Sequence, residues 1–205
     1  MIHVTDQYTG LTTNGRYIGS AFNVNFPIFT ILNDNDILGI VHLGAKAANL
    51  SGLGDIYHIF LPRGVDVCIN RTSLCYAPDI PSLHTLCGYH TSVKFSDIAQ
   101  TVYYTVEPYQ AVSGCVVAQS PTASPNGALV DSTANLLSHE LFETITDPDA
   151  ESSFLVRRTT QELGAEVADI CEVVGFRYPD SFIGARFYRI QEEYSNTYHA
   201  CANVP

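Results

Sequence analysis

The chain has 205 residues, of which 46% are hydrophobic and 15% are charged, and its net charge at pH 7 is −11. This length is typical of one domain, here residues 1–205, and the share of charged residues is too low for a disordered chain. The acidic balance excludes nucleic acids and anionic membranes as partners, because both require clustered Lys and Arg, and no apolar run approaches the ~20 residues that span a bilayer.

The first part of the chain is predicted to be rich in strands. Residues 17–32 contain many aromatic and β-branched residues, which favour strands, with an interruption at Pro27. The run of Asn and Asp at residues 33–36 is typical of a turn. Further strands are predicted at residues 37–43, 56–61, 65–69, 89–95 and 101–106, with loops at 45–55 and 120–127. Strands that precede the main helix indicate an α+β fold.

The strongest helix is predicted at residues 131–147. Asp131 or Ser132 can cap its N-terminus, and Pro148 prevents its continuation. At 100° per residue, one face carries Ala134, Leu137, Leu141 and Ile145, and a neighbouring face carries His139, Glu140, Glu143 and Asp147. An extended segment, a short helix and a strand are predicted to follow at residues 154–158, 162–171 and 184–190.

Most of the acidic residues lie in the last part of the chain. Residues 131–205 hold 13 of the 21 Asp and Glu residues, including eight of the nine glutamates. Such charge either solvates a surface or surrounds a cation. Glu192 and Glu193 are interpreted as solvated surface. The carboxylates at positions 140, 143 and 147 share one helix face, where like charges repel, and therefore need a compensating cation more than most faces do.

Residues 139–143 read H-E-x-x-E, which is close to the zinc-peptidase motif H-E-x-x-H. Positions i and i+4 lie one helical turn apart, so both side chains can reach one metal ion, and the intervening Glu faces the attacking water. His139 and Glu143 are therefore predicted to bind Zn²⁺, and Glu140 is predicted to be the general base. The alternative is a solvated helix face without a metal.

A third ligand is expected from elsewhere in the chain. Glu166 and Asp169 lie three residues apart in a segment that resembles the second helix of thermolysin-like peptidases. That resemblance implies Glu166 as the third ligand and Asp169 as the residue that orients a ligand, and the two roles can be exchanged. Asp147 is predicted to support the ligands in the same way.

Two further residues are alternatives for the site. Asp149 follows His139 by ten residues, where a metzincin pattern places its last ligand, although that pattern has glycine at the position of Thr146. His90 is a candidate for a catalytic group that polarises the substrate, or for a ligand. A lone histidine in a strand can also be purely structural, so this role is weighed against a structural one.

Six cysteines without a C-x-x-C pair indicate disulfides rather than a zinc finger or a thioredoxin-type site. An even count together with only two lysines is typical of a secreted protein, and the sequons at Asn49 and Asn70 are compatible with glycosylation. The sequence does not choose among the possible pairings, and the pairing expected is Cys68–Cys75, Cys87–Cys115 and Cys171–Cys201. The alternative is a cytosolic protein with six free thiols.

Two linked segments occur together, residues 138–148 (SHELFETITDP) and residues 166–171 (EVADIC). They resemble the core of the exordium, or phosphate-induced protein, family of plants and, more closely, its secreted microbial relatives. Weaker matches lie at residues 60–65, 87–90 and 195–201. The resemblance implies a zincin-like core in which Glu is the normal last residue of the motif. The relatives usually carry Trp-Tyr after T-D-P, whereas this chain has no Trp.

The sequence thus predicts an α+β, zincin-like domain in which a mixed β-sheet packs against the helix that carries the H-E-x-x-E motif. The predicted function is that of a secreted, monomeric zinc endopeptidase that hydrolyses peptide or protein substrates. One alternative is a non-enzymatic secreted cell-wall protein that holds a structural metal such as Ca²⁺. Another is a metal-free glycoside hydrolase that works with the paired carboxylates of Glu140 and Glu166.

Overall fold

The computed structural model describes residues 27, 29–52, 54–70, 74–117, 124–150, 166–173, 180–183 and 186–202. The chain divides into two units, Ile18–Val116, which we call the sheet unit, and Val117–Pro205 with Met1–Tyr17, which we call the helix unit. Both units combine helices with β-strands, so the predicted α+β class is confirmed. The single domain expected over residues 1–205 stays a prediction.

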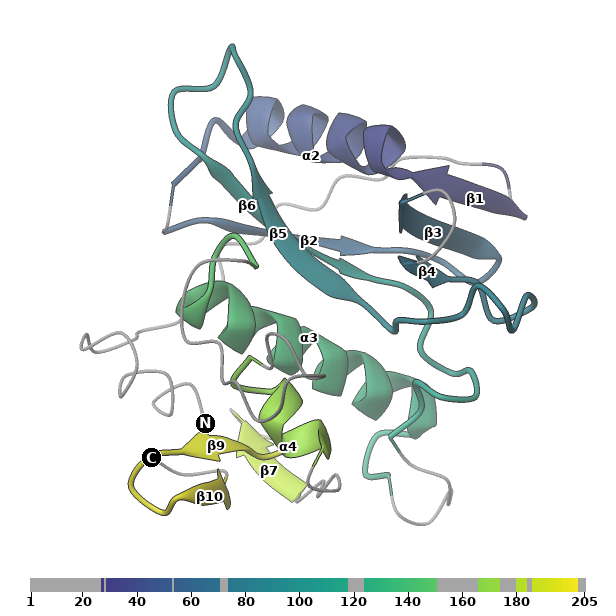
Figure 1. Ribbon diagram of the computed structural model, residues 1–205, viewed down its shortest axis with the longest axis vertical. Coiled ribbons are helices and arrows are strands. Elements are labelled where there is room, and N and C mark those ends of the chain that lie inside the picture. The colour runs from purple at the N-terminus through teal and green to yellow at the C-terminus, as the bar shows by residue number, and fades with distance from the viewer. Residues whose placement is uncertain are drawn as a thin grey trace, which may run out of the picture. The chain divides into compact units, whose positions relative to one another are not determined.

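Two three-stranded sheets lie in the sheet unit (Figure 1), and both are mixed, because each central strand is parallel to one neighbour and antiparallel to the other. The first sheet has the strand order β1 (Thr30–Asn33), β3 (Val65–Asn70) and β4 (Leu74–Tyr76). The second has the order β2 (Ile56–Phe60), β6 (Val102–Glu107) and β5 (Tyr89–Val93). The strands predicted at residues 56–61, 65–69, 89–95 and 101–106 are therefore confirmed.

The turn and the short strand predicted between residues 33 and 43 are wrong, because a helix, α2 (Asp34–Ala48), occupies this segment. Asn33 caps it. The side-chain oxygen of Asn33 accepts a hydrogen bond from the backbone N–H of Asn35, and Asp36 accepts one from the backbone N–H of Asn33, both at 2.9 Å. This reciprocal capping supplies acceptors for N–H groups that the first helical turn leaves unpaired.

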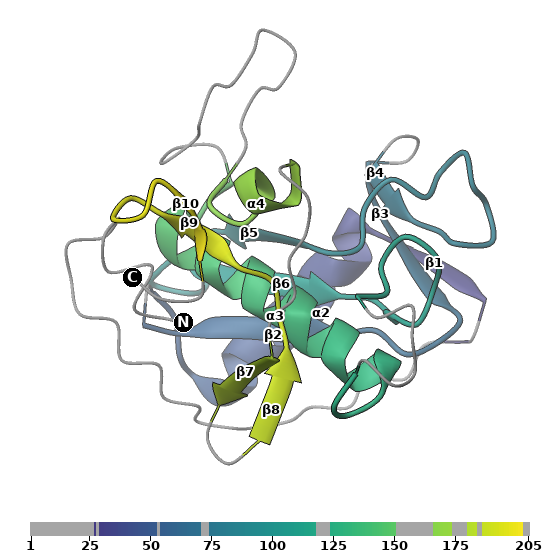
Figure 2. The same cartoon turned by 90° about the horizontal axis from the view of Figure 1, so that it is seen from below.

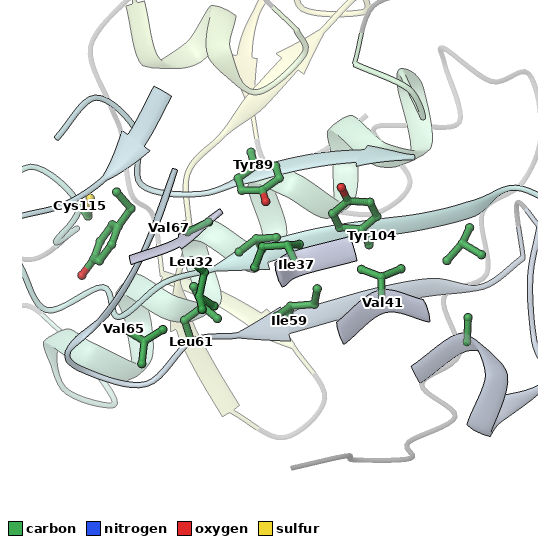
Figure 3. Packing of buried hydrophobic residues seen from close by; sticks show 14 residues of the cluster. Leu32, Ile37, Val41, Ile59, Leu61, Val65, Val67, Tyr89, Tyr104 and Cys115 are labelled. Atoms are coloured by element: carbon green, nitrogen blue, oxygen red, sulfur yellow. The ribbon is translucent and has the colours of Figure 1, made fainter. Parts of the chain in front are cut away.

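The hydrophobic core of the sheet unit is built from α2 and strands of both sheets (Figure 3). Ile37, Val41 and Ala45 lie four residues apart along α2 and are almost completely buried. They belong to one cluster with Ile59 of β2 and Tyr104 of β6. The four-residue spacing places the apolar side chains on one stripe of a helix, which explains why this segment does not form a strand.

Two helices and two β-hairpins form the described part of the helix unit (Figure 2). The helices are α3 (Ala128–Thr146) and α4 (Asp169–Val173), and the strands are β7 (Asp180–Ile183), β8 (Arg186–Arg189), β9 (Glu193–Ser195) and β10 (Ala200–Ala202). The strand β8 lies against α3, and β9 lies against α4. The helix at 131–147 and the strand at 184–190 are confirmed, and the helix at 162–171 is confirmed from Asp169 onward. The predicted segment 154–158 lies outside the described residues.

The N-terminus of α3 differs from the prediction. Gly127 is the N-cap residue and makes no side-chain capping bond, whereas Asp131 and Ser132 lie inside the helix. The carboxylate of Asp131 accepts hydrogen bonds from residues of other segments, namely Ser124, Asn126 and Arg189. The predicted cap is therefore wrong, because this carboxylate joins α3 to the preceding loop and to β8 instead of satisfying the N–H groups of its own helix.

Three disulfides join the cysteines in the predicted pairs, Cys68–Cys75, Cys87–Cys115 and Cys171–Cys201. The first crosses from β3 to β4, where the two residues are partners in the strand register. The third connects α4 to β10. Among the described residues, no helix combines the length and the apolar composition that a membrane span requires.

Candidate metal centre

The face of α3 that carries the H-E-x-x-E motif is buried. Glu140 and Glu143 are 3% and 2% exposed, whereas Leu137 and Leu141 of the predicted apolar face are only half-buried. The alternative of a solvated helix face is therefore wrong. Carboxylates in the protein interior need hydrogen bonds or a cation to offset the loss of water.

Three side chains converge at this face. His139 Nε2 lies 3.1 Å from Glu143 Oε2 and 3.5 Å from Asp169 Oδ1. The three donor atoms all lie within 4.8 Å of one another. His139 and Glu143 lie one turn apart on α3, and Asp169 is the first residue of α4. The short helix thus adds one carboxylate oxygen to the pair that the longer helix presents.

The second oxygen of each carboxylate binds a backbone N–H group. Glu143 Oε1 accepts a hydrogen bond from the backbone N–H of Asp169 at 3.3 Å. Asp169 Oδ2 accepts one from the backbone N–H of Glu166 at 3.4 Å. These bonds fix both carboxylates so that the other oxygen of each faces His139 Nε2. The donor set is therefore held in place by the protein itself.

A fourth acidic residue lies near this group. Alternate side chains of the segment 191–195 are buried: Gln191, Glu193 and Ser195. Glu193 is 0% exposed, and within the described part of the chain neither of its side-chain oxygens has a hydrogen-bond partner. Burial raises the pKa of Glu193 well above its usual value; His139 lowers it, and Glu143 and Asp169 raise it further. The interpretation of Glu193 as solvated surface is wrong, because the alternation along this segment turns its side chain inward.

The cluster carries more negative charge than one histidine can balance. Burial lowers the pKa of His139, but Glu143, Glu140 and Asp169 together raise it well above its usual value. Burial raises the pKa of Glu143 to about 7, with His139 lowering it and the other two carboxylates raising it. The site therefore favours a cation at His139 Nε2, which is either a proton or a metal ion.

Two of the three donor separations can be compared with those around a zinc ion. Tetrahedral zinc at its usual ligand distances keeps neighbouring donors about 3.3 Å apart. The separations from His139 Nε2 to the two carboxylate oxygens are 3.1 Å and 3.5 Å. Imidazole nitrogen and carboxylate oxygen are both ordinary zinc ligands, whereas Ca²⁺ takes about six to eight oxygen ligands at longer distances. The donor set therefore fits Zn²⁺ better than Ca²⁺.

The other residues predicted in this part of the chain lie around the group. Glu140 is on the same buried face of α3. Glu166 lies three residues before α4 and is not part of the group of His139, Glu143 and Asp169, which contains the alternative that the sequence left open. The role of Glu166 as a ligand stays a prediction. Asp147 is buried at the C-terminal end of α3, and Asp149 is exposed. The supporting role of Asp147 stays a prediction.

His90 lies in the sheet unit, on β5. Its register partner is Thr105 on β6, which also pairs with His58 on β2. His58 Nδ1 lies 2.7 Å from the Thr105 hydroxyl, which donates a hydrogen bond to Glu107. The two histidines thus flank one threonine across three strands. The catalytic role of His90 stays a prediction.

Comparisons with protein-family models, with curated proteins and with solved structures give no match. The resemblance to the exordium family and the zincin-like arrangement both stay predictions. Any function for this chain must therefore be argued from the geometry around His139.

Proposed function

We propose that the chain is a secreted, zinc-dependent endopeptidase of the zincin type, with His139, Glu143 and Asp169 as its metal ligands. The observation that carries this proposal is the convergence of one imidazole nitrogen and two carboxylate oxygens from two helices, with the second oxygen of each carboxylate held by a backbone N–H. Carboxylates on a solvated surface are stabilised by water and do not need hydrogen bonds from backbone N–H groups. The three disulfides support an oxidising compartment outside the cell.

Glu140 is the proposed general base. It lies beside the ligand histidine in the motif, on the buried face of α3, and it interacts electrostatically with both His139 and Glu143. Bound zinc would polarise the substrate carbonyl and make a water molecule a stronger acid. The carboxylate of Glu140 would accept the proton of the attacking water and pass it to the leaving amine. The substrates proposed are peptides or proteins.

The first test is metal binding. The native protein is analysed for zinc and then, after treatment with a chelator, titrated with zinc by calorimetry beside His139→Ala and Asp169→Asn. The matched control is Asp149→Asn, which removes an exposed carboxylate of the same unit and tests the metzincin alternative. We expect zinc in the native protein and in the control, and at least tenfold weaker binding in both ligand variants. A native protein that does not bind zinc contradicts the proposal.

The second test is hydrolysis of casein by the zinc-loaded protein. Glu140→Gln keeps the shape of the side chain but cannot accept a proton, so we expect it to retain zinc and to lose hydrolysis. Zinc binding without any hydrolysis in the native protein favours the structural metal site of a non-enzymatic protein. Hydrolysis of a glycoside that survives a strong chelator favours the metal-free alternative.

A further inference from the structure

We propose that Gln191 is a positioning residue of the metal centre. Its side-chain amide holds His139 in the state that carries a proton on Nδ1 and presents Nε2 to Glu143 and Asp169. The consequence for metal affinity rests on the proposed function, but the state of the imidazole is a property of the protein that can be measured without a metal.

The orientation of the amide follows from its contact with Ala168. Gln191 Nε2 lies 3.1 Å from the carbonyl oxygen of Ala168. A carbonyl oxygen only accepts hydrogen bonds, so the NH₂ group must face it, and Oε1 must point the other way. Oε1 lies 3.1 Å from His139 Nδ1. Because an amide oxygen also only accepts, Nδ1 must carry a proton and donate it.

This bond decides which ring nitrogen is available to a metal. A neutral imidazole with its proton on Nδ1 has its lone pair on Nε2. Nε2 is the nitrogen that faces the oxygens of Glu143 and Asp169. In the opposite tautomer the lone pair would face the oxygen of Gln191, and Nε2 could not bind a metal. Gln191 therefore selects the tautomer that completes the donor set.

The position of Gln191 is itself fixed. Its side chain is buried, and its backbone N–H donates to Asn135 Oδ1 at 2.6 Å. Asn135 lies on α3, one turn before His139. The side-chain amide of Gln191 donates a hydrogen bond to the backbone carbonyl of Ala168, which directly precedes Asp169. One side chain thus connects the ligand on α3 with the start of α4, and sets their spacing as well as the tautomer.

The test compares Gln191→Met with Gln110→Met. Methionine has nearly the volume of glutamine but provides no strong acceptor for Nδ1–H. Gln110 is the matched control, because it is also 1% exposed and its amide also donates to backbone carbonyls, those of Cys87 and Pro108. We expect both variants to lose thermal stability, and only Gln191→Met to bind zinc tenfold to hundredfold more weakly. Gln191→Glu retains an acceptor for Nδ1–H and is expected to bind zinc more tightly than Gln191→Met.

The metal-free arm uses ¹⁵N NMR of the histidine rings at a pH high enough that His139 is neutral, because a protonated ring carries protons on both nitrogens. The His139 signals are assigned by their absence in His139→Ala. We expect a protonated, slowly exchanging Nδ1 in the native protein and in Gln110→Met, and a rapidly exchanging Nδ1 in Gln191→Met. An unprotonated Nδ1 in the native protein overturns the inference, and so does an unchanged His139 spectrum in Gln191→Met. A native protein that shows the protected Nδ1 proton but binds no zinc contradicts the proposed function and leaves this assignment supported.

Discussion

Replacing Glu193 by glutamine is expected to have opposite effects with and without metal. The carboxyl group is completely buried, has no hydrogen-bond partner within the described residues and lies among other acidic groups. In the metal-free protein burial raises its pKa, which favours the neutral form. In the zinc-loaded protein its negative charge would help to balance the ion. Glutamine removes the charge and nearly preserves the shape.

The magnitude without metal follows from proton linkage. Because the pKa of Glu193 is raised on folding, the folded state holds a proton that the unfolded state releases, and stability falls as the pH rises above the unfolded pKa. A glutamate with an unfolded pKa near 4.3 that stays neutral at pH 7 lowers the free energy of unfolding by at most about 4 kcal/mol. We therefore expect Glu193→Gln to be as stable as the native protein at pH 4, and more stable by up to that amount at pH 7.

The assay is urea unfolding with a chelator at pH 4 and pH 7, followed by thermal unfolding with and without zinc. Zinc is expected to raise the melting temperature of the native protein more than that of Glu193→Gln, because a tenfold loss of affinity removes about 1.4 kcal/mol of stabilisation. Asp79→Asn is the control for loss of an exposed charge. A variant that is less stable than the native protein at pH 7 without metal, or that gains as much from zinc, refutes the reasoning.

Three further predictions concern stability. Removing the Cys171–Cys201 disulfide, which closes a separation of 30 residues, is expected to lower the free energy of unfolding by about 3–4 kcal/mol, against about 2 kcal/mol for Cys68–Cys75 with a separation of 7, as measured by urea unfolding. Burial raises the pKa of Asp131, but hydrogen bonds, that from Ser124 first among them, outweigh this and lower it. The stability that this carboxylate contributes is therefore present above its unfolded pKa near 3.9 and lost as the pH falls through the folded value, so Asp131→Asn should lower stability by about 1–3 kcal/mol at pH 7 and less at pH 3. Asn33→Ala removes the cap of α2 and should lower the melting temperature through a loss of about 1 kcal/mol, whereas a turn at this position would leave it nearly unchanged.

The sequence predicts correctly those elements whose residue pattern favours a single type of secondary structure. The strands at 56–61 and 101–106 are rich in aromatic and β-branched residues, and the helix at 131–147 is limited by Pro148, so all three are confirmed. The segment that begins at Asn33 has two readings, because Asn and Asp favour turns and helix caps for the same reason, namely that their side chains accept hydrogen bonds from nearby backbone N–H groups. The apolar residues that follow, four positions apart, were the signal for the helix.

Only part of the candidate site could be predicted from the sequence. His139 and Glu143 lie one turn apart on the same helix, so their convergence follows from helical geometry alone. Gln191 and Glu193 approach the same point from some 50 residues away in the sequence, and no local pattern contains that contact. A weak signal existed in the alternation of Gln191, Glu193 and Ser195, which is the period of a strand with one buried face. The prediction instead followed the general rule that glutamates lie in solvent.

Part of the negative charge of the chain lies in the interior, where a carboxylate needs a compensating positive charge, and not on a solvated surface. An exposed carboxylate is compensated by water, so it says nothing about a ligand. The carboxylates of Glu140, Glu143 and Glu193, which are buried, and that of Asp169, which is partly exposed, interact electrostatically with His139 or with one another inside the helix unit. One protonated histidine balances one of them, whereas a divalent cation beside a neutral histidine balances two. A divalent cation at His139, as proposed, would therefore offset more of the negative charge of this cluster than a proton on the histidine does.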